Sequence, residues 1–358
     1  MSKKYTYIIG VLVFCFLLPS CVKGDHYSPV SPVILDLESE PFTSLSEYNF
    51  FKGNIAELNP VYGVLPYKII SGLFIDYAKA KTFVWMPKGK KATYVNDYSI
   101  FDFPDGTVLI TTHYFENVLP KKDTRLIETR LIIKNEGKWV LVNYVWNNEQ
   151  TEATYTKEGS SVGVKLLENN ETRSVNYNIP SYDECFTCHN KYDAILPIGP
   201  KPQNINFNFA FKDGIKNQLE KWVAYGYLED NYPENIVSAV NWEDESQPLN
   251  LRARSYLDIN CAHCHSEKGY CNYPPMRFAF NKTEDPKNMG ICVQHGFDIN
   301  ESLTHIVSPN NTDKSALLFR MSSILDEYKM PIIGRSLKHE EGVDLIEQWI
   351  NSLDNICN

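Results

Sequence analysis

Between residues 49 and 179 the chain alternates apolar and polar positions over short segments, the period that is typical of β-strands. β-Branched and aromatic residues concentrate in five of these segments, which we predict to be strands at 82–86, 99–103, 107–114, 126–133 and 139–146. Turn sequences, such as PDG at 104–106 and NEG at 135–137, separate them. The segments 126–134 and 138–146 predict an antiparallel hairpin, and the whole region predicts a mostly-β, sandwich-like domain.

After Pro180 the apolar positions change to helical intervals. We predict helices at 212–224, 247–259 and 337–353. The last of these is amphipathic, and strand signals fade in the same region. The predicted fold class is therefore α+β, with a mostly-β domain followed by an all-α domain.

The N-terminus has the layout of a secretory signal, with Lys3 and Lys4 followed by an apolar stretch at 8–18. The sequence LPSC at 18–21 resembles a lipoprotein box, in which Cys21 becomes the mature N-terminus and carries acyl chains. The alternatives are an ordinary cleaved signal and a membrane helix, but the 11 residues of this stretch are too few to cross a bilayer. We predict a lipid-anchored protein of the cell envelope, preferentially of the outer membrane.

Length and charge narrow the classes of function. A chain of 358 residues with 43% hydrophobic content is long enough to bury two cores. The formal net charge is -9, and no run of basic residues follows the N-terminal region. A nucleic-acid partner is therefore excluded, and contact with a membrane is expected through the lipid anchor.

Two Cys-x-x-Cys-His motifs carry the candidate chemistry. They consist of Cys185, Cys188 and His189, and of Cys261, Cys264 and His265. In c-type haem attachment, two thiols at this spacing bond the vinyl groups of the porphyrin, and the histidine that follows binds the iron. The motifs predict one or two covalently attached haem c groups and a function in electron transfer. A zinc site and a redox dithiol also use Cys-x-x-Cys, but neither requires a histidine after the second cysteine in both copies.

The region around the second motif resembles a class I cytochrome c domain. The helix predicted at 247–259 leads into Cys261, and the amphipathic helix at 337–353 closes the chain. The resemblance implies that these two helices cross, that Met330 in the KMPIIG sequence at 329–334 is the sixth iron ligand, and that a carbonyl at Pro274 or Pro275 accepts a hydrogen bond from His265. Met321 is the alternative ligand. A thioether ligand raises the reduction potential of a haem, which suits an electron carrier.

The first motif has no obvious distal ligand, because neither Met nor His lies between His189 and the helix that leads into Cys261. The candidates elsewhere in the chain are His113, His295, His305 and Met276. A five-coordinate first haem is equally allowed.

Three cysteines remain outside the motifs, the signal and the lipidation site. They are Cys271, Cys292 and Cys357. Export to an oxidising compartment favours a disulfide, and we predict one between Cys271 and Cys292, which flank the segment below the second haem. Cys357 is the poorer partner because chain ends fray.

Several sequence stretches together resemble a poorly characterised family of secreted bacterial proteins with two Cys-x-x-Cys-His motifs. They are LFIDYA at 73–78, FDFPDGTV at 101–108, IETR at 127–130, the segment 139–147, and both motifs. Some members are fused to sugar-dehydrogenase propellers that use pyrroloquinoline quinone, so the resemblance implies electron transfer from a periplasmic oxidation. This chain has Thr111 and His113 where many members have Lys and Phe, and it carries no propeller.

The predicted organisation is a signal peptide at 1–20, a tether at 21–48, a β-rich domain at 49–179, the first motif segment at 180–240 and a cytochrome c-like domain at 241–358. The leading hypothesis is a lipid-anchored electron carrier with a redox partner in the cell envelope, such as a periplasmic dehydrogenase. The alternative is a dihaem enzyme, peroxidase-like or oxidase-like, whose first haem lacks a strong distal ligand. A third class, a structural or carbohydrate-binding lipoprotein, requires both motifs to be accidental.

Overall fold

A computed structural model describes residues 29–168, 170–296, 299–354 and 357. Its centre is an eight-stranded antiparallel sheet in the order β1-β2-β3-β4-β5-β6, and β7 joins this sheet by pairing with both β3 and β8. The strands are β1 Leu65–Tyr67, β2 Lys79–Trp85, β3 Val108–Val118, β4 Asp123–Asn135, β5 Lys138–Trp146, β6 Ala153–Thr156, β7 Ser160–Glu168 and β8 Glu171–Ile179. Short hairpins follow at β9 Asn190–Lys191 with β10 Ala194–Ile195, and at β11 Asn208–Phe211 with β12 Gly214–Asn217.

The predicted hairpin at 126–134 and 138–146 is confirmed. Strands β4 and β5 pair in register from Glu128 opposite Val145 to Asn135 opposite Lys138. Their two-residue connection, Glu136 and Gly137, has positive φ at both positions, which matches the twist of the flanking strands.

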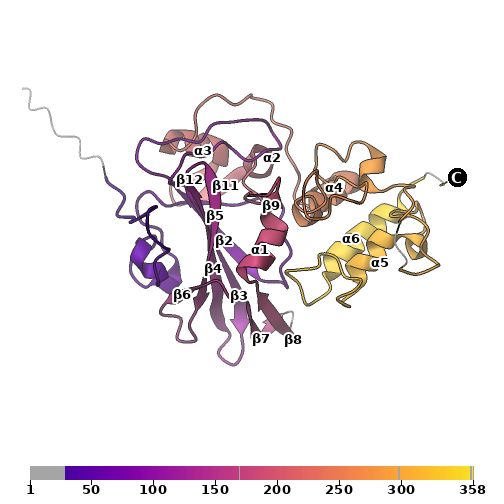
Figure 1. The fold of residues 1–358 in the computed structure, drawn as a ribbon, viewed down its shortest axis with the longest axis horizontal. Helices are drawn as coiled ribbons and strands as arrows, with labels where there is room; N and C mark the ends of the chain where they lie inside the picture. Colours follow the sequence, from indigo (N-terminus) through magenta and orange to yellow (C-terminus); the bar gives the residue numbers. More distant parts are fainter. Residues whose placement is uncertain (1–28, 169, 297–298, 355–356, 358) are drawn as a thin grey trace, which may run out of the picture.

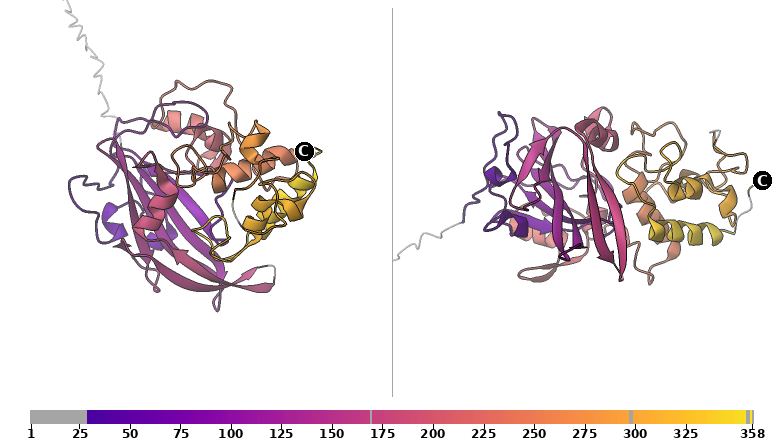
Figure 2. Two further views of the ribbon diagram at one scale, coloured as in Figure 1. Left: turned by 45° about the vertical axis from the view of Figure 1, so that its right-hand side comes forward. Right: turned by 90° about the horizontal axis from the view of Figure 1, so that it is seen from below.

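The helices are α1 Tyr182–His189, α2 Pro202–Ile205, α3 Gln218–Tyr225, α4 Leu249–Cys261, α5 Ala316–Ser322 and α6 Glu340–Asn351. Short 3₁₀ helices lie at Leu45–Tyr48, Ile55–Glu57, Pro286–Met289 and Thr312–Lys314. Figures 1 and 2 show α4, α5 and α6 together beside α1 and the β7–β8 hairpin, on the opposite side of the sheet from the N-terminal segment. None of the helices in the described ranges is both long and apolar enough to cross a membrane.

The predicted fold class is wrong in both halves. The β region is one sheet covered on two faces by helices and irregular chain, whereas a sandwich has two sheets packed together. The region 241–358 is not an all-α cytochrome domain. Its three α-helices have 13, 7 and 12 residues, and 3₁₀ turns, isolated β-bridges and long loops make up the rest of its described residues. Apolar spacing alone did not reveal these loops, because their buried residues are held by contacts with distant segments.

The sheet is buried on both faces because side chains of a strand point alternately to opposite sides. On β3, Val108 and Ile110 pack with Leu45 and Tyr48 of the N-terminal segment, while Leu109 packs on the other face. That second face is covered by the region around α2 and α3, including Trp222. Phe42, Leu45 and Tyr48 therefore pack in the core, although we expected a tether there.

Two further predictions from the pattern are wrong. The segment 99–103 is not a strand, since only an isolated bridge joins Thr93 and Asp102, and Phe101 and Phe103 are both buried near Trp222. The helix predicted at 212–224 is replaced by the β11–β12 hairpin and the shorter α3. Gly214, the first residue of β12, follows the turn with φ of 115°, and a helix cannot include that conformation.

Candidate functional site

The first motif lies on α1, whose N-terminus is fixed by a capping box between Ser181 and Glu184. The helix ends with His189, whose Nδ1 lies 2.8 Å from the carbonyl oxygen of Leu196. A carbonyl only accepts, so Nδ1 carries the proton and Nε2 keeps its lone pair. Burial lowers the pKa of His189 to about 4, which keeps the ring neutral. A neutral imidazole oriented by a backbone carbonyl is the arrangement of a metal ligand.

The second motif begins at the last residue of α4 and continues through one further turn, in which the His265 amide donates to the carbonyl of Cys261. The His265 ring is buried and meets Phe278 edge to face at 5.4 Å. Its Nδ1 has no hydrogen-bond partner among the described residues. The hydrogen bond expected from this ring to a carbonyl at Pro274 or Pro275 is therefore not formed, and the Pro274 carbonyl accepts from Arg277.

A cavity beside the second motif unites three of the predicted site residues. Cys261, His265 and Met330 all line it, and its empty volume is about 1000 Å³, part of it open to solvent. Most other lining side chains are apolar or aromatic, including those of Met276, Phe278, Ile306, Leu317, Met321 and Val343. We name this space the Met330 cavity. Cys264, the other thiol of the motif, does not line it.

Two arginines bring positive charge into the Met330 cavity. Arg335 is 4% exposed and donates through its terminal nitrogens to the carbonyls of Leu337, Arg320 and Ser323. Its Nε has no partner among the described residues, and Arg320 lines the same cavity. Burial lowers the pKa of Arg335. A buried guanidinium with a spare donor favours an anionic ligand, and the propionates of a haem are such anions.

The loop at 73–77, before β2, forms one wall of this cavity, which our reading of the sequence did not foresee. Phe74 lines the cavity and stacks on His339, with ring centroids 4.0 Å apart. Asp76 is 1% exposed, and its carboxylate accepts hydrogen bonds from the backbone of Ser336 and Leu337. Asp76 therefore anchors the segment between Met330 and α6. The only sequence signal was its place in the LFIDYA stretch.

A second cavity lies between the two motifs. Its empty volume is about 1450 Å³ including open solvent, and Cys188, His189, His263 and His265 line it. We name it the inter-motif cavity. Cationic side chains lie around it, namely Lys191, Lys201, Lys282 and Arg277. Cys185 opens instead into a smaller neighbouring cavity of about 410 Å³, which His189 and Arg130 also line.

The structure brings the motifs into contact through Cys188, His263 and Cys264, whose ligand atoms all lie within 4.8 Å of one another. Interaction with the neighbouring thiol of Cys264 and with His263 holds the pKa of Cys188 well below its usual value, although burial opposes them. Burial raises the pKa of Cys185 to about 11 and that of Cys261 to about 12. Two sulfurs and an imidazole nitrogen are donors that suit zinc, so a zinc site is the alternative interpretation of this cluster. Sequence reasoning treated His263 as a spacer residue of its motif.

The four distal candidates for the first motif lie away from the inter-motif cavity. His295 and Met276 line the Met330 cavity. His113 is on β3 opposite Glu128, and His305 bonds to the hydroxyl of Thr304 at 2.9 Å. The contacts of these side chains therefore favour none of the four as a partner of Cys185 and Cys188.

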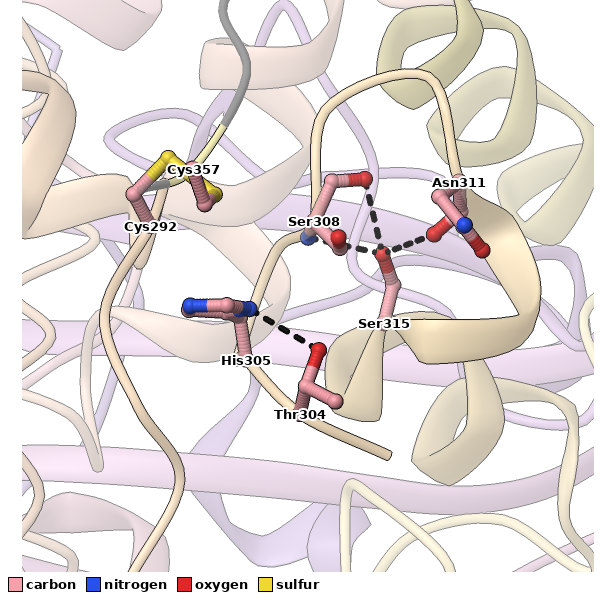
Figure 3. The surroundings of a disulfide bond; sticks show 7 residues. All are labelled: Cys292, Thr304, His305, Ser308, Asn311, Ser315 and Cys357. Atoms are coloured by element: carbon pink, nitrogen blue, oxygen red, sulfur yellow. Dashed lines mark hydrogen bonds between the residues drawn. A yellow bond between two sulfur atoms is a disulfide. The ribbon is translucent and has the colours of Figure 1, made fainter. Parts of the chain in front are cut away.

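The predicted disulfide between Cys271 and Cys292 is wrong. Cys292 is bonded to Cys357, with 5.2 Å between their Cα atoms, and Cys271 is a buried free thiol. Figure 3 shows this bond beside the loop that contains His305 and Ser315. Trp349 and Ile350 hold α6 in the core, and Cys357 follows this helix by a few residues, so its place near the chain end does not make it the poorer partner.

The signal peptide at 1–20 and the lipidation site Cys21 lie outside the described residues, as does the first part of the tether. No protein-family model, curated protein or solved structure matches this chain.

Proposed function

We propose that this protein is a c-type cytochrome of the cell envelope, with one haem bonded to Cys185 and Cys188 and a second to Cys261 and Cys264. Its function is to transfer electrons between partner proteins, a periplasmic dehydrogenase among them. The observation that carries the proposal is the Met330 cavity, which Cys261, His265 and Met330 all line. This apolar cavity holds the imidazole of His265, the thioether of Met330 and the buried guanidinium of Arg335, which are the kinds of group that a haem needs.

The chain's own residues define what such a site does. Haem supplies reversible one-electron chemistry at its iron. His265 and Met330 provide the nitrogen and sulfur ligands, Arg335 offsets anionic charge, and Phe278 and Phe74 exclude water. In the first motif, Leu196 fixes the tautomer of His189 so that Nε2 is free to bind iron.

Export and lipid anchoring at Cys21 belong to the same proposal. The disulfide between Cys292 and Cys357 fits a protein that folds in an oxidising compartment. The signal-like N-terminus and the LPSC sequence at 18–21 supply the route and the anchor.

We expect the purified protein to carry two covalent haems and no zinc. Pyridine haemochrome absorbance and the mass of the intact chain count the haems, and elemental analysis counts zinc. A Cys185→Ala/Cys188→Ala variant and a Cys261→Ala/Cys264→Ala variant should each retain one haem. Stoichiometric zinc without covalent haem would refute the proposal in favour of a site at Cys188, His263 and Cys264.

A Met330→Ala variant should keep both covalent haems but lose the sulfur-to-iron charge-transfer band of the ferric protein and gain a high-spin signal. The reason is that Met330 and His265 line one cavity, while covalent attachment depends only on the thiols. Met321→Leu is the matched control, because Met321 lines the same cavity but is packed in the core. Loss of the band in the Met321 variant alone would reassign the ligand.

A further inference from the structure

We propose that His263, inside the second motif, is the distal iron ligand of the haem bonded to Cys185 and Cys188. The inference rests on the proposed function, since it requires a haem at the first motif. It assigns the distal ligand of the first haem, which the sequence left open. The second motif would then supply one ligand of the haem that is bonded to the first motif.

The first support is position. His263 lines the inter-motif cavity together with Cys188 and His189, the second thiol and the proximal histidine of the first motif. A ligand nitrogen of His263 lies within 4.8 Å of the Cys188 sulfur. Because that sulfur fixes one edge of the porphyrin, the His263 ring is within reach of the same haem.

The second support is the hydrogen bonding of the His263 ring. The Nδ1 atom of His263 is buried and has no hydrogen-bond partner among the described residues. Leaving a buried nitrogen without a partner is unfavourable, so such an atom needs an explanation. Binding of one ring nitrogen to iron gives the ring a function, and the wide cavity beside it leaves room for the porphyrin.

The third support is that the other candidate ligands in this cavity already have another role or partner. Besides His263, the histidines that line the inter-motif cavity are His189 and His265, which are the proximal ligands of the two motifs. Lys201, which also lines the cavity, pairs with both carboxylate oxygens of Asp258 at 3.1 and 3.2 Å. Among the described residues that line this cavity, His263 is therefore the histidine left to act as distal ligand.

Under this assignment the two haems would differ in reduction potential. The first haem would have two histidine ligands, and the second would have histidine and methionine. Nitrogen ligands lower the potential relative to a thioether, so the first haem would have the lower potential of the two. His263 and His265 are separated by Cys264 alone, and the three residues form a short covalent link between the two irons. A first iron with two histidine ligands would also argue against the alternative of a dihaem enzyme.

The test is a His263→Gly variant of the full haem-loaded protein, followed by electron paramagnetic resonance, optical spectra and redox titration. We expect two haems per chain, conversion of the first haem from low spin to high spin, and return to low spin when imidazole is added. The second haem should keep its sulfur charge-transfer band. An unchanged low-spin signal in a variant with two haems would overturn the assignment.

A His263→Met variant keeps the inference testable if the glycine variant folds poorly. It should remain low-spin, and the potential of the first haem should rise, because a thioether replaces an imidazole. An unchanged potential would overturn the assignment. A wild-type protein without haem on Cys185 and Cys188 would overturn this assignment and the first of the two proposed haem sites, which haem counting on peptides detects independently of spin state.

Discussion

A Glu128→Ala substitution is expected to lower the free energy of unfolding by about 3–5 kcal/mol, because it leaves a charge without its counter-ion inside the protein. Glu128 is on β4 and has no exposed surface. Its Oε1 accepts from Arg130 at 2.5 Å and from the hydroxyl of Tyr177 at 2.6 Å. Burial raises the pKa of Glu128, but the positive charge of Arg130 outweighs it and holds that pKa below its usual value. Chemical denaturation of the haem-loaded protein measures the loss.

The matched control replaces both partners with apolar residues, as Glu128→Leu together with Arg130→Met. Removing a buried ion pair as a whole is often neutral or stabilising, so the double variant should be clearly more stable than Glu128→Ala. Equal losses in the two variants would contradict the argument, since the cost would then arise from lost packing alone.

The same ion pair connects the sheet with the first motif. Arg130 lines the small cavity that Cys185 and His189 also line, and its charge acts on the pKa of both residues. With a haem bonded to Cys185 and Cys188, as proposed, its optical spectrum should report on this contact in both variants.

Parts of the fold were predictable because they depend on local signals. The β4–β5 hairpin has a turn sequence at Glu136 and Gly137 between two alternating segments, and the structure confirms it. The helices predicted at 247–259 and 337–353 correspond to α4 and α6, whose ends shift by a few residues. The Cys-x-x-Cys-His motif and the resemblance to a class I cytochrome c domain also named Cys261 and Met330, which line one cavity.

The remaining features depend on contacts between distant segments, which periodicity does not report. Leu45 and Tyr48 look like part of a polar tether, but the sheet offers them an apolar face. Asp76 is a common surface residue type, and its burial follows from backbone amides at Ser336 and Leu337 that need an acceptor. The Cys292 to Cys357 bond likewise follows from the anchoring of α6.

His263 is the candidate ligand that the sequence pattern did not single out. A Cys-x-x-Cys-His motif directs attention to its first, fourth and fifth positions, and the third is read as a spacer. The contact of Cys188 with His263 and Cys264 joins segments about seventy residues apart in the chain, and only the folded structure brings them together. A histidine at a spacer position is nevertheless a visible signal in the printed sequence.

A His113→Phe substitution should make the stability of the protein less sensitive to acid. His113 is 6% exposed on β3, and burial, aided by the charge of Arg130 and opposed by that of Glu128, lowers its pKa to about 3 from an ordinary value of 6.5. The unfolded chain therefore binds a proton below about pH 6.5 that the folded protein does not bind until about pH 3. Stability from this group is complete above pH 6.5 and is lost as the pH falls.

One proton changes the free energy of unfolding by about 1.4 kcal/mol per pH unit, so between about pH 7 and about pH 4.5 the wild type should lose roughly 2–3 kcal/mol more than the variant. Denaturation curves at matched pH values measure this difference, because titratable groups away from His113 contribute equally to both proteins. Parallel losses in the two proteins would show that His113 is already protonated in the folded state.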